Sequence, residues 1–227
     1  MMVTIQRAEI DGTAKAPASK SFTHRALITA ALADGTSRIE NPLTSYDTEA
    51  TSGILRALGV AIEEGKKGWL VNGGHLKANP KELYCNESGT TMRFVTAICT
   101  SVEGRCKITG APQLLRRPIG DLVGALRQLG ARCSSNGDFP PVVTEDSLIG
   151  GKASIRGDIS SQFVSALLLV APLAQNPVTV ELSTALESLP YVNMTMSSQK
   201  LFGVEVKAGK GMMFFCSNGH LVFGSIK

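Results

Sequence analysis

The sequence predicts an α/β fold, of the α+β kind, with three repeated βαβαββ units around a pseudo-threefold axis. One observation behind this prediction is a glycine that follows a helix-like stretch and precedes a strand-like one. It recurs at Gly59, Gly130 and Gly203, with spacings of 71 and 73 residues. A glycine just past a helix supplies the left-handed residue that ends it. Self-similarity at a fixed period indicates an internal repeat.

A second register, of serines that open apolar helical stretches, agrees with the first. Ser19, Ser88 and Ser160 are spaced by 69 and 72 residues, and serine is a preferred helix N-cap. Helices are expected at residues 21–33, 90–102 and 161–174. A strand pattern follows each of them, at residues 37–40, 105–108 and 178–182.

A second helix is expected to close each unit. In the second unit Pro118 stands where a first-turn proline is tolerated, and an apolar stripe at helical spacing follows it, which we assign to the core. The stripe consists of Leu122, Val123, Leu126 and Leu129. Pro190 plays a similar part before a helix at 191–202. Residues 136–147, which include two adjacent prolines, are expected to form a loop between strands.

The composition indicates a folded chain that suits a small anionic ligand. Of the 227 residues, 43% are hydrophobic, which argues against disorder. The net charge of +4 comes from scattered lysines and arginines and not from a concentrated basic face, so no nucleic-acid partner is expected. The three units would occupy residues 15–80, 81–151 and 152–227, with no linker between them.

The cysteines and the apolar stretches indicate a cytoplasmic chain. The five cysteines are spread singly, without a Cys-x-x-Cys pair, so reduced thiols and no metal site are expected. The first nine residues have mixed charge and no long apolar core, unlike a signal peptide. The longest apolar stretch, residues 163–174, is too short to span a bilayer, so no membrane partner is expected.

The candidate site begins at residues 17–27, where a proline and small hydroxyl residues open a helix rich in alanine and leucine. Lys20, Ser21 and Arg25 fall in its first turns. A helix start offers free N–H groups and the positive end of a dipole, and the added cations and hydroxyl suit a phosphate or a carboxylate. The alternative interpretation is an ordinary capped helix with solvated charges.

The repeat extends this site to three helices. If the units surround one axis, their first helices run parallel and their N-termini gather at one end. Gly89 would then allow close approach of the backbone, and Arg93 and Arg117 would add fixed cations. Helix capping explains the recurring serines, but it does not explain Lys20, Arg25 and Gln162 beside them.

No side chain stands out as a nucleophile or a base. The sequence has no Gly-x-Ser-x-Gly elbow, no His-Glu-x-x-His and no Walker loop. His75 and His220 lie in matching Gly-His-Leu triplets and are interpreted as turn residues, while His24 is expected to be a partly exposed helix residue. The expected chemistry is therefore electrostatic, without a covalent intermediate.

Four motifs occur in a family order and at family-like spacing over nearly the whole chain. They are Ser19-Lys20-Ser21 with Arg25-Ala26-Leu27, Ser88-Gly89-Thr90-Thr91-Met92-Arg93, Arg117-Pro118-Ile119 with Leu122, and Ser160-Ser161-Gln162-Phe163; Ser188-Leu189-Pro190-Tyr191 is a weaker fifth. Together they resemble the 3-phosphoshikimate 1-carboxyvinyltransferase family, which carries out the enolpyruvyl-transferring step of the shikimate pathway.

This resemblance implies a fold and a set of roles. The fold is one domain of the enolpyruvyl transferase inside-out barrel, in which two domains hold the reactants between them. The residues that would bind shikimate 3-phosphate are Lys20, Ser21, Arg25, Ser160, Ser161, Gln162 and Ser188, with Tyr191 as a neighbour. Those that would hold phosphoenolpyruvate are Lys20, Gly89, Arg117 and Gln162. Lys20 would stabilise charge and carry a proton, and no metal or organic cofactor is implied.

The chain departs from the family at three positions and in length. Glu87 stands where the family often has asparagine, and Leu115 and Leu189 stand where a basic residue is common. The family chain is about twice as long, so the resemblance implies an N-terminal half whose partner, the C-terminal domain, is absent. Such a half would bind shikimate 3-phosphate but turn over poorly alone. Residues 1–14 resemble a strand that crosses to the second domain in the family.

Two other interpretations are kept. One is half of a UDP-N-acetylglucosamine enolpyruvyl transferase, which shares the repeat but usually has Lys-Asn in place of Lys20-Ser21 and often carries a loop cysteine in this half. The other is a non-catalytic anion-binding module built from the same repeat. Ligand binding distinguishes the three.

Overall fold

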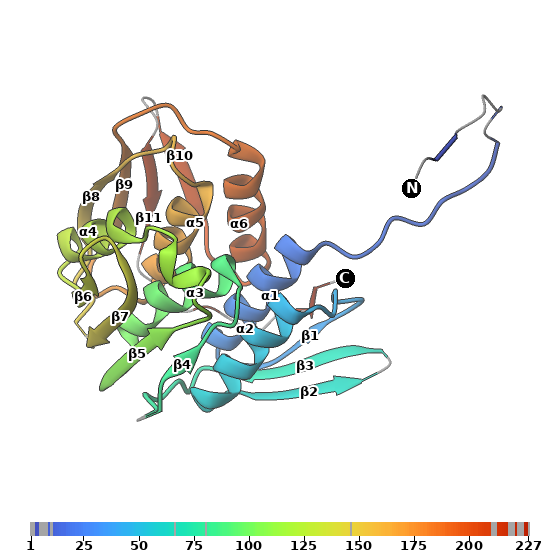
Figure 1. Cartoon of the computed structure of the whole chain (residues 1–227), viewed down its shortest axis with the longest axis horizontal. Coiled ribbons are helices and arrows are strands. Elements are labelled where there is room, and N and C mark those ends of the chain that lie inside the picture. The colour runs from blue at the N-terminus through green and yellow to red at the C-terminus, as the bar shows by residue number, and fades with distance from the viewer. Residues whose placement is uncertain are drawn as a thin grey trace.

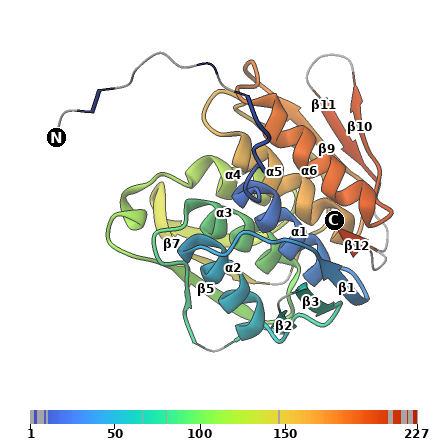
Figure 2. The same cartoon turned by 90° about the vertical axis from the view of Figure 1, so that its right-hand side faces the viewer.

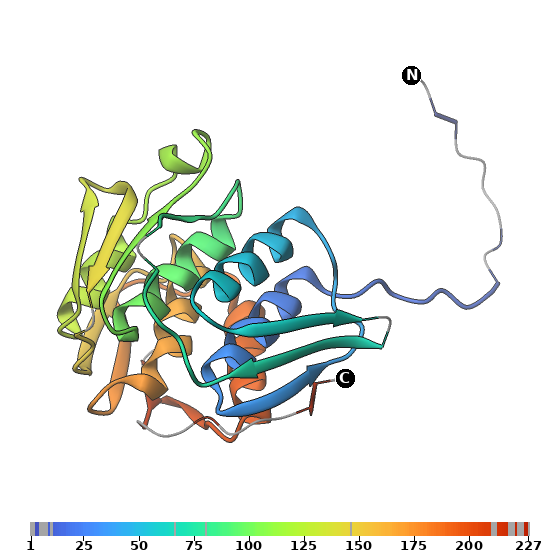
Figure 3. The ribbon, with the colours of Figure 1, turned by 90° about the horizontal axis from the view of Figure 1, so that it is seen from below.

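Three four-stranded sheets surround a group of helices in the part of the chain that the structure describes. The structure is a computed structural model, and it describes residues 3–4, 9, 11–65, 67–79, 81–145, 147–209, 213–217, 221 and 225–226. Figure 1 shows the helices in the middle with the sheets outside them, and Figure 3 shows helices between the blue-to-teal sheet and the yellow strands of another. This arrangement confirms the predicted α/β class.

The three sheets have the same strand order. In sheet order their strands are β12 (Ser225–Ile226), β1 (Gly35–Ile39), β3 (Gly68–Gly73) and β2 (Ala61–Gly65); β4 (Leu83–Tyr84), β5 (Arg105–Thr109), β7 (Phe139–Glu145) and β6 (Arg132–Asn136); and β8 (Gly151–Ile155), β9 (Val178–Leu182), β11 (Met213–Cys216) and β10 (Val206–Gly209). In every sheet the first pair is parallel and the next two pairs are antiparallel. The same supersecondary unit therefore occurs three times, as the spacing of the glycines and the spacing of the serines both predict.

The outer strand of the first sheet comes from the end of the sequence. β12 pairs in parallel with β1, with Arg38 opposite Ser225, and Figure 2 shows the two strands side by side. The sequence analysis assigned these last residues to the third unit and did not predict this exchange. Within residues 1–14, the described ones belong to no helix or strand; the others lie outside the described residues, and the crossing strand stays a prediction.

The helices fall into two groups of three. The leading ones are α1 (Lys20–Leu32), α3 (Gly89–Ile98) and α5 (Ser161–Val170), and the closing ones are α2 (Tyr46–Ala57), α4 (Gly120–Gln128) and α6 (Leu189–Leu201). Short 3-10 turns lie at η1 (Cys99–Ser101), η2 (Leu114–Arg116) and η3 (Ala171–Leu173). Helix α4 begins two residues after Pro118, so the expected first-turn proline is wrong, whereas Pro190 does lie in the first turn of α6.

Both repeated signals act as predicted. The hydroxyls of Ser19, Ser88 and Ser160 cap the leading helices by accepting hydrogen bonds from Phe22 N at 3.3 Å, Thr91 N at 3.2 Å and Gln162 N at 3.2 Å. Gly59, Gly130 and Gly203 follow the closing helices with φ of +97°, +83° and +81°. The residue after each glycine then donates its N–H back into the helix, to Leu55 O, Leu126 O and Gln199 O.

The core lies between the helices and the inner faces of the sheets. Every residue of α5 except Gln162 is buried, and the predicted stripe of Leu122, Val123, Leu126 and Leu129 is at most 1% exposed. Apolar burial of this extent is the main stabilising term in a fold of this size. None of the described helices combines the length and the apolar character that crossing a membrane requires.

One predicted loop is wrong. Residues 139–145 form β7, in which Pro140, Val142 and Thr144 point inward, and the strand pairs with both β5 and β6. The prolines misled the prediction, because proline cannot donate to a strand ladder. They are tolerated here because pairing with β5 starts only at Val142, and the pairing with β6 shifts its register at Ser135 and Asn136.

Two glycines give opposite expectations for replacement by alanine. A Cβ on Gly73, at the end of β3, would lie 2.2 Å from Ala30 O, 2.5 Å from Ala33 O and 2.7 Å from Ala31 O, all in the backbone of α1 and its end. Gly73→Ala should therefore lower the free energy of unfolding by more than about 3 kcal/mol. Gly53→Ala in α2, where the new Cβ meets nothing within 4 Å, should raise it by roughly 0.5–1 kcal/mol. Urea unfolding measures both, and equal effects would contradict the close approach of β3 to α1.

Candidate functional site

Lys20, the first residue of α1, forms an ion pair with the carboxylate of Asp47 in the first turn of α2. Nζ lies 2.6 Å from Oδ2, and the two side chains are 49% and 31% exposed. An exposed ion pair of this kind contributes little to stability, so an anion that binds nearby can compete with Asp47 for the lysine. The sequence analysis missed Asp47, although its place in the first turn after the N-cap Ser45 was a readable signal.

Gly89, the first residue of α3, lies against two arginines. A Cβ on Gly89 would be 3.0 Å from Arg93 Nη1 and 3.2 Å from Arg117 Nη1. Burial lowers the pKa of Arg93, and the neighbouring charge of Arg117 lowers it further. A hollow of about 10 Å³ lies between these residues and Pro118. The glycine thus brings bare backbone N–H groups and two like charges together, which favours an anion.

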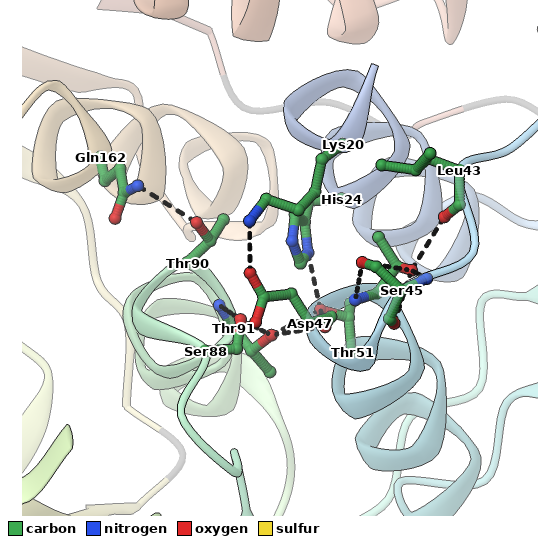
Figure 4. A network of polar contacts seen from close by, with 11 residues as sticks. Lys20, His24, Leu43, Ser45, Asp47, Thr51, Ser88, Thr90, Thr91 and Gln162 are labelled. Carbon is green, nitrogen blue, oxygen red and sulfur yellow. Dashed lines mark hydrogen bonds and ion pairs between the residues drawn. The ribbon is translucent and has the colours of Figure 1, made fainter. Parts of the chain in front are cut away.

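Gln162 connects the starts of α3 and α5. Its Nε2 donates to Thr90 Oγ1 at 3.1 Å, and its Oε1 accepts a hydrogen bond from Arg93 Nη1. The guanidinium of Arg93 also lies 5.2 Å from the centre of the Phe163 ring. Figure 4 shows Lys20, Thr90 and Gln162 on three neighbouring helix starts. The structure therefore brings Lys20, Gly89, Arg117 and Gln162 to one end of the leading helices.

Arg25 is buried and links three helices, α1, α5 and α6, through hydrogen bonds. It is 1% exposed, and it donates from Nε to Thr195 Oγ1 at 2.6 Å, from Nη2 to Ser165 Oγ at 3.0 Å and from Nη1 to Ser21 O at 2.9 Å. Burial lowers its pKa to about 10, so it remains a cation at neutral pH. All of these acceptors are neutral, so its charge is solvated but not neutralised.

The three arginines of the site have no carboxylate partner among the described residues. The ion pairs found among the described residues include Lys20 but none of Arg25, Arg93 and Arg117. Arg25 is buried and Arg93 half-buried, whereas Arg117 is exposed beside Arg93. A buried charge in a protein is usually paired, because an uncompensated charge in the interior costs free energy. An uncompensated group of cations at three helix starts is typical of a site whose counter-ion is a ligand.

The remaining predicted site residues lie at the starts of α5 and α6. Ser160 is the N-cap of α5 and Ser161 its first residue, and Ser161 is 8% exposed with no hydrogen bond from its hydroxyl to another described residue. Ser188 precedes α6 with a φ of +59°, and Tyr191 is exposed in the first turn of the helix whose Thr195 contacts Arg25. The hydroxyl of Ser161 is therefore available to a ligand.

His24 is not the partly exposed residue that was expected. It is fully buried, and its Nδ1 lies 2.8 Å from Thr51 Oγ1, which in turn lies 2.7 Å from Thr91 Oγ1 (Figure 4). The prediction was wrong because α1 is buried on almost every face, which no amphipathic pattern reveals. His75 is an exposed loop residue, as predicted, and His220 lies outside the described residues. The described part of the chain holds no group of metal-ligating side chains, and all its cysteines are buried and free.

The buried imidazole gives the protein a predictable sensitivity to acid. Burial lowers the pKa of His24 from 6.5 to about 4, so the unfolded chain binds a proton more readily than the folded one between these values. Stability is complete above pH 6.5 and should fall by about 3 kcal/mol as the pH drops to 4. His24→Asn keeps a polar group beside Thr51 but cannot titrate. Urea midpoints should therefore depend less on pH in this variant, and equal slopes for both proteins would contradict the buried neutral histidine.

Comparisons with known proteins agree with this geometry. A family model described as EPSP synthase (3-phosphoshikimate 1-carboxyvinyltransferase) matches residues 5–219. A 3-phosphoshikimate 1-carboxyvinyltransferase of Methanothermobacter thermautotrophicus is 40% identical over 216 residues, covering 93% of this chain and 51% of the relative. One of Nitrosomonas europaea is 42% identical over 209 residues, covering 89% and 48%.

A solved structure gives the same result in three dimensions. EPSP synthase from Acinetobacter baumannii superposes with a TM-score of 0.82 at 27% identity, covering 94% of this chain and 49% of that one. The chain thus spans about half the length of the curated relatives it matches. It belongs to the EPSP synthase (3-phosphoshikimate 1-carboxyvinyltransferase) family of transferases.

Proposed function

We propose that this chain is the shikimate 3-phosphate-binding half of an enzyme that transfers enolpyruvyl from phosphoenolpyruvate to shikimate 3-phosphate. The observation that carries the proposal is the group of arginines without a carboxylate partner at three helix starts. Both proposed substrates bear a phosphate and a carboxylate, which are the groups that such starts and guanidinium forks bind. Neither a metal nor an organic cofactor has a part in the proposal.

The two substrates would occupy neighbouring parts of the site. Shikimate 3-phosphate would lie over Ser21, Arg25, the start of α5 and Ser188. Phosphoenolpyruvate would lie at Gly89 beside Arg117, and in this proposal Lys20 and Gln162 would lie between the two substrates. Lys20 and Gln162 would thus contact both substrates.

In the proposed reaction the ring's 5-hydroxyl loses its proton and attacks the enol carbon while the methylene carbon gains a proton and becomes a methyl group. Phosphate then leaves and one methyl proton is removed, which restores the double bond of the enolpyruvyl group. Fixed positive charge near the reacting atoms stabilises the charge that develops on phosphate and carboxylate in such a step. Lys20 is placed to supply such a charge and to carry a proton, because its ammonium group is partly exposed and is held by only one exposed carboxylate.

A second half is part of the proposal. Tyr46, Ile159, Leu189 and Tyr191, which lie at or beside the starts of α2, α5 and α6, are between 40% and 86% exposed. Exposed large apolar side chains near the helix starts are consistent with a surface that another body covers. The C-terminal domain of the longer relatives is the body that we propose, and a cytoplasmic location suits this pathway.

Binding of shikimate 3-phosphate tests the proposal without any need for turnover. Calorimetric titration of the wild-type chain should show saturable binding. Ser161→Ala should weaken it about tenfold, since one hydrogen bond to a charged acceptor is lost. Ser197→Ala, on the far part of α6, is the matched control and should bind like the wild type. Binding of UDP-N-acetylglucosamine instead would favour the other transferase, and binding of neither ligand would favour a module of unrelated function.

Turnover should require the second half. Phosphate release from phosphoenolpyruvate and shikimate 3-phosphate should be close to background with this chain alone, because cations on one side only leave the site open to water. Addition of a separately produced C-terminal half from a relative should restore it. Robust turnover by this chain alone would contradict the incomplete-site part of the proposal while leaving the substrate assignment intact.

A further inference from the structure

We propose that Thr51 is a positioning residue for the phosphoenolpyruvate-binding start of α3. It would act through a buried chain of hydrogen bonds that begins at His24 of α1, passes through Thr51 of α2 and ends at Thr91 and Ser88 of α3. This inference rests on the proposed function, and it adds to it residues that contact no substrate.

The chain is continuous and closed to water. His24 Nδ1 lies 2.8 Å from Thr51 Oγ1, Thr51 Oγ1 lies 2.7 Å from Thr91 Oγ1, and Thr91 Oγ1 donates to Ser88 Oγ at 2.6 Å. All four residues are at most 1% exposed. Figure 4 shows them between the starts of α1, α2 and α3. The three hydroxyls and His24 Nδ1 are all hydrogen-bonded, and buried bonds of this kind rigidify the elements they join.

The chain also holds the backbone that carries Asp47. The carbonyl oxygen of Asp47 lies 3.2 Å from Thr91 Oγ1 and 3.4 Å from Thr51 Oγ1. The carboxylate of the same residue pairs with Lys20. Each hydroxyl has one proton, and the chain uses them from Thr51 to Thr91 and from Thr91 to Ser88, so the contacts with the Asp47 carbonyl are close packing and not further hydrogen bonds. The bond between Thr51 and Thr91 is the one that joins the α2 start, with the partner of Lys20, to the α3 start. Loss of the Thr51 hydroxyl would loosen this link.

The unpaired nitrogen of His24 sets the direction of the chain. His24 Nε2 is buried and has no hydrogen-bond partner among the described residues. An orphaned buried N–H is rarer than an orphaned acceptor, so the proton belongs on Nδ1, from which it is donated to Thr51. Thr51 then donates to Thr91 and Thr91 to Ser88. Every donor in the chain points from α1 toward α3.

The structure provides a matched control on α3 itself. Thr96 is fully buried, and its hydroxyl has no partner among the described residues. Thr96→Val removes a buried threonine hydroxyl just as Thr51→Val does, but it breaks no hydrogen bond. A difference between the two variants therefore reports the chain and not the loss of a hydroxyl in general.

The test compares Thr51→Val, Thr51→Ser and Thr96→Val with the wild type. Nitrogen-15 spectra of the histidine rings, of which the chain has three, read the tautomer of His24. Titration with phosphoenolpyruvate, followed at the Gly89 amide, gives the affinity. We expect an Nδ1–H tautomer in the wild type, a changed His24 spectrum and an affinity about tenfold weaker in Thr51→Val, wild-type behaviour in Thr51→Ser, and no change in Thr96→Val.

The outcomes separate this inference from the proposed function. Equal affinities for Thr51→Val and Thr96→Val, or an Nε2–H tautomer, would overturn the positioning role even if phosphoenolpyruvate binds. Failure of the wild type to bind phosphoenolpyruvate would overturn the proposed place of that substrate at Gly89 and the affinity role with it, while the titration with shikimate 3-phosphate still tests the proposed function and the His24 spectra still decide whether the chain runs as inferred. If Thr51→Val does not fold, Thr51→Ala removes the hydroxyl without adding a methyl group and takes its place in the comparison.

Discussion

The positive charge at the start of the leading helices is the constraint on which the rest of this structure depends. Arg25 is buried among neutral partners, and Arg93 stacks on Phe163 beside Arg117. The surrounding fold holds the charges of Arg25 and Arg93 in place at a cost in desolvation. The hydroxyls of α5 and α6 and the amide of Gln162 solvate these cations without neutralising them, which keeps the charge available to a ligand.

The repeat explains how a chain of this size brings those charges together. Each unit has a serine-capped leading helix whose body is buried, so all three leading helices form core and their N-termini form the proposed site. The sheets pack outside these helices (Figure 1), and β12 completes the first sheet in the way that β4 and β8 complete the others. Stability and binding are therefore properties of the same helices.

The features that could be predicted from the sequence are those that depend on local backbone chemistry and recur in each unit. Serine caps and left-handed glycines act within a few residues, so their spacing placed the starts of the leading helices within one residue, whereas the predicted ends of the second and third lay four residues too far along the chain. The sequence analysis missed what depends on distant residues: the burial of His24, the strand at 139–145 and the pairing of β12. Asp47 was predictable in part. Its position at a helix start can be inferred from the sequence, but its contact with Lys20 joins α2 to α1 and depends on the fold.

Charge that is held in place without a counter-ion also links ligand binding to stability. A ligand that binds only the folded state adds RT ln(1 + [L]/Kd) to the free energy of unfolding. In this site the gain has a structural source, since an anion would relieve the repulsion between Arg93 and Arg117 and neutralise the charge of Arg25. By this reasoning an anion bound at the proposed site should raise the free energy of unfolding, and the proposed role of the buried chain from His24 to Ser88 is to hold the start of α3 in the geometry that such an anion needs.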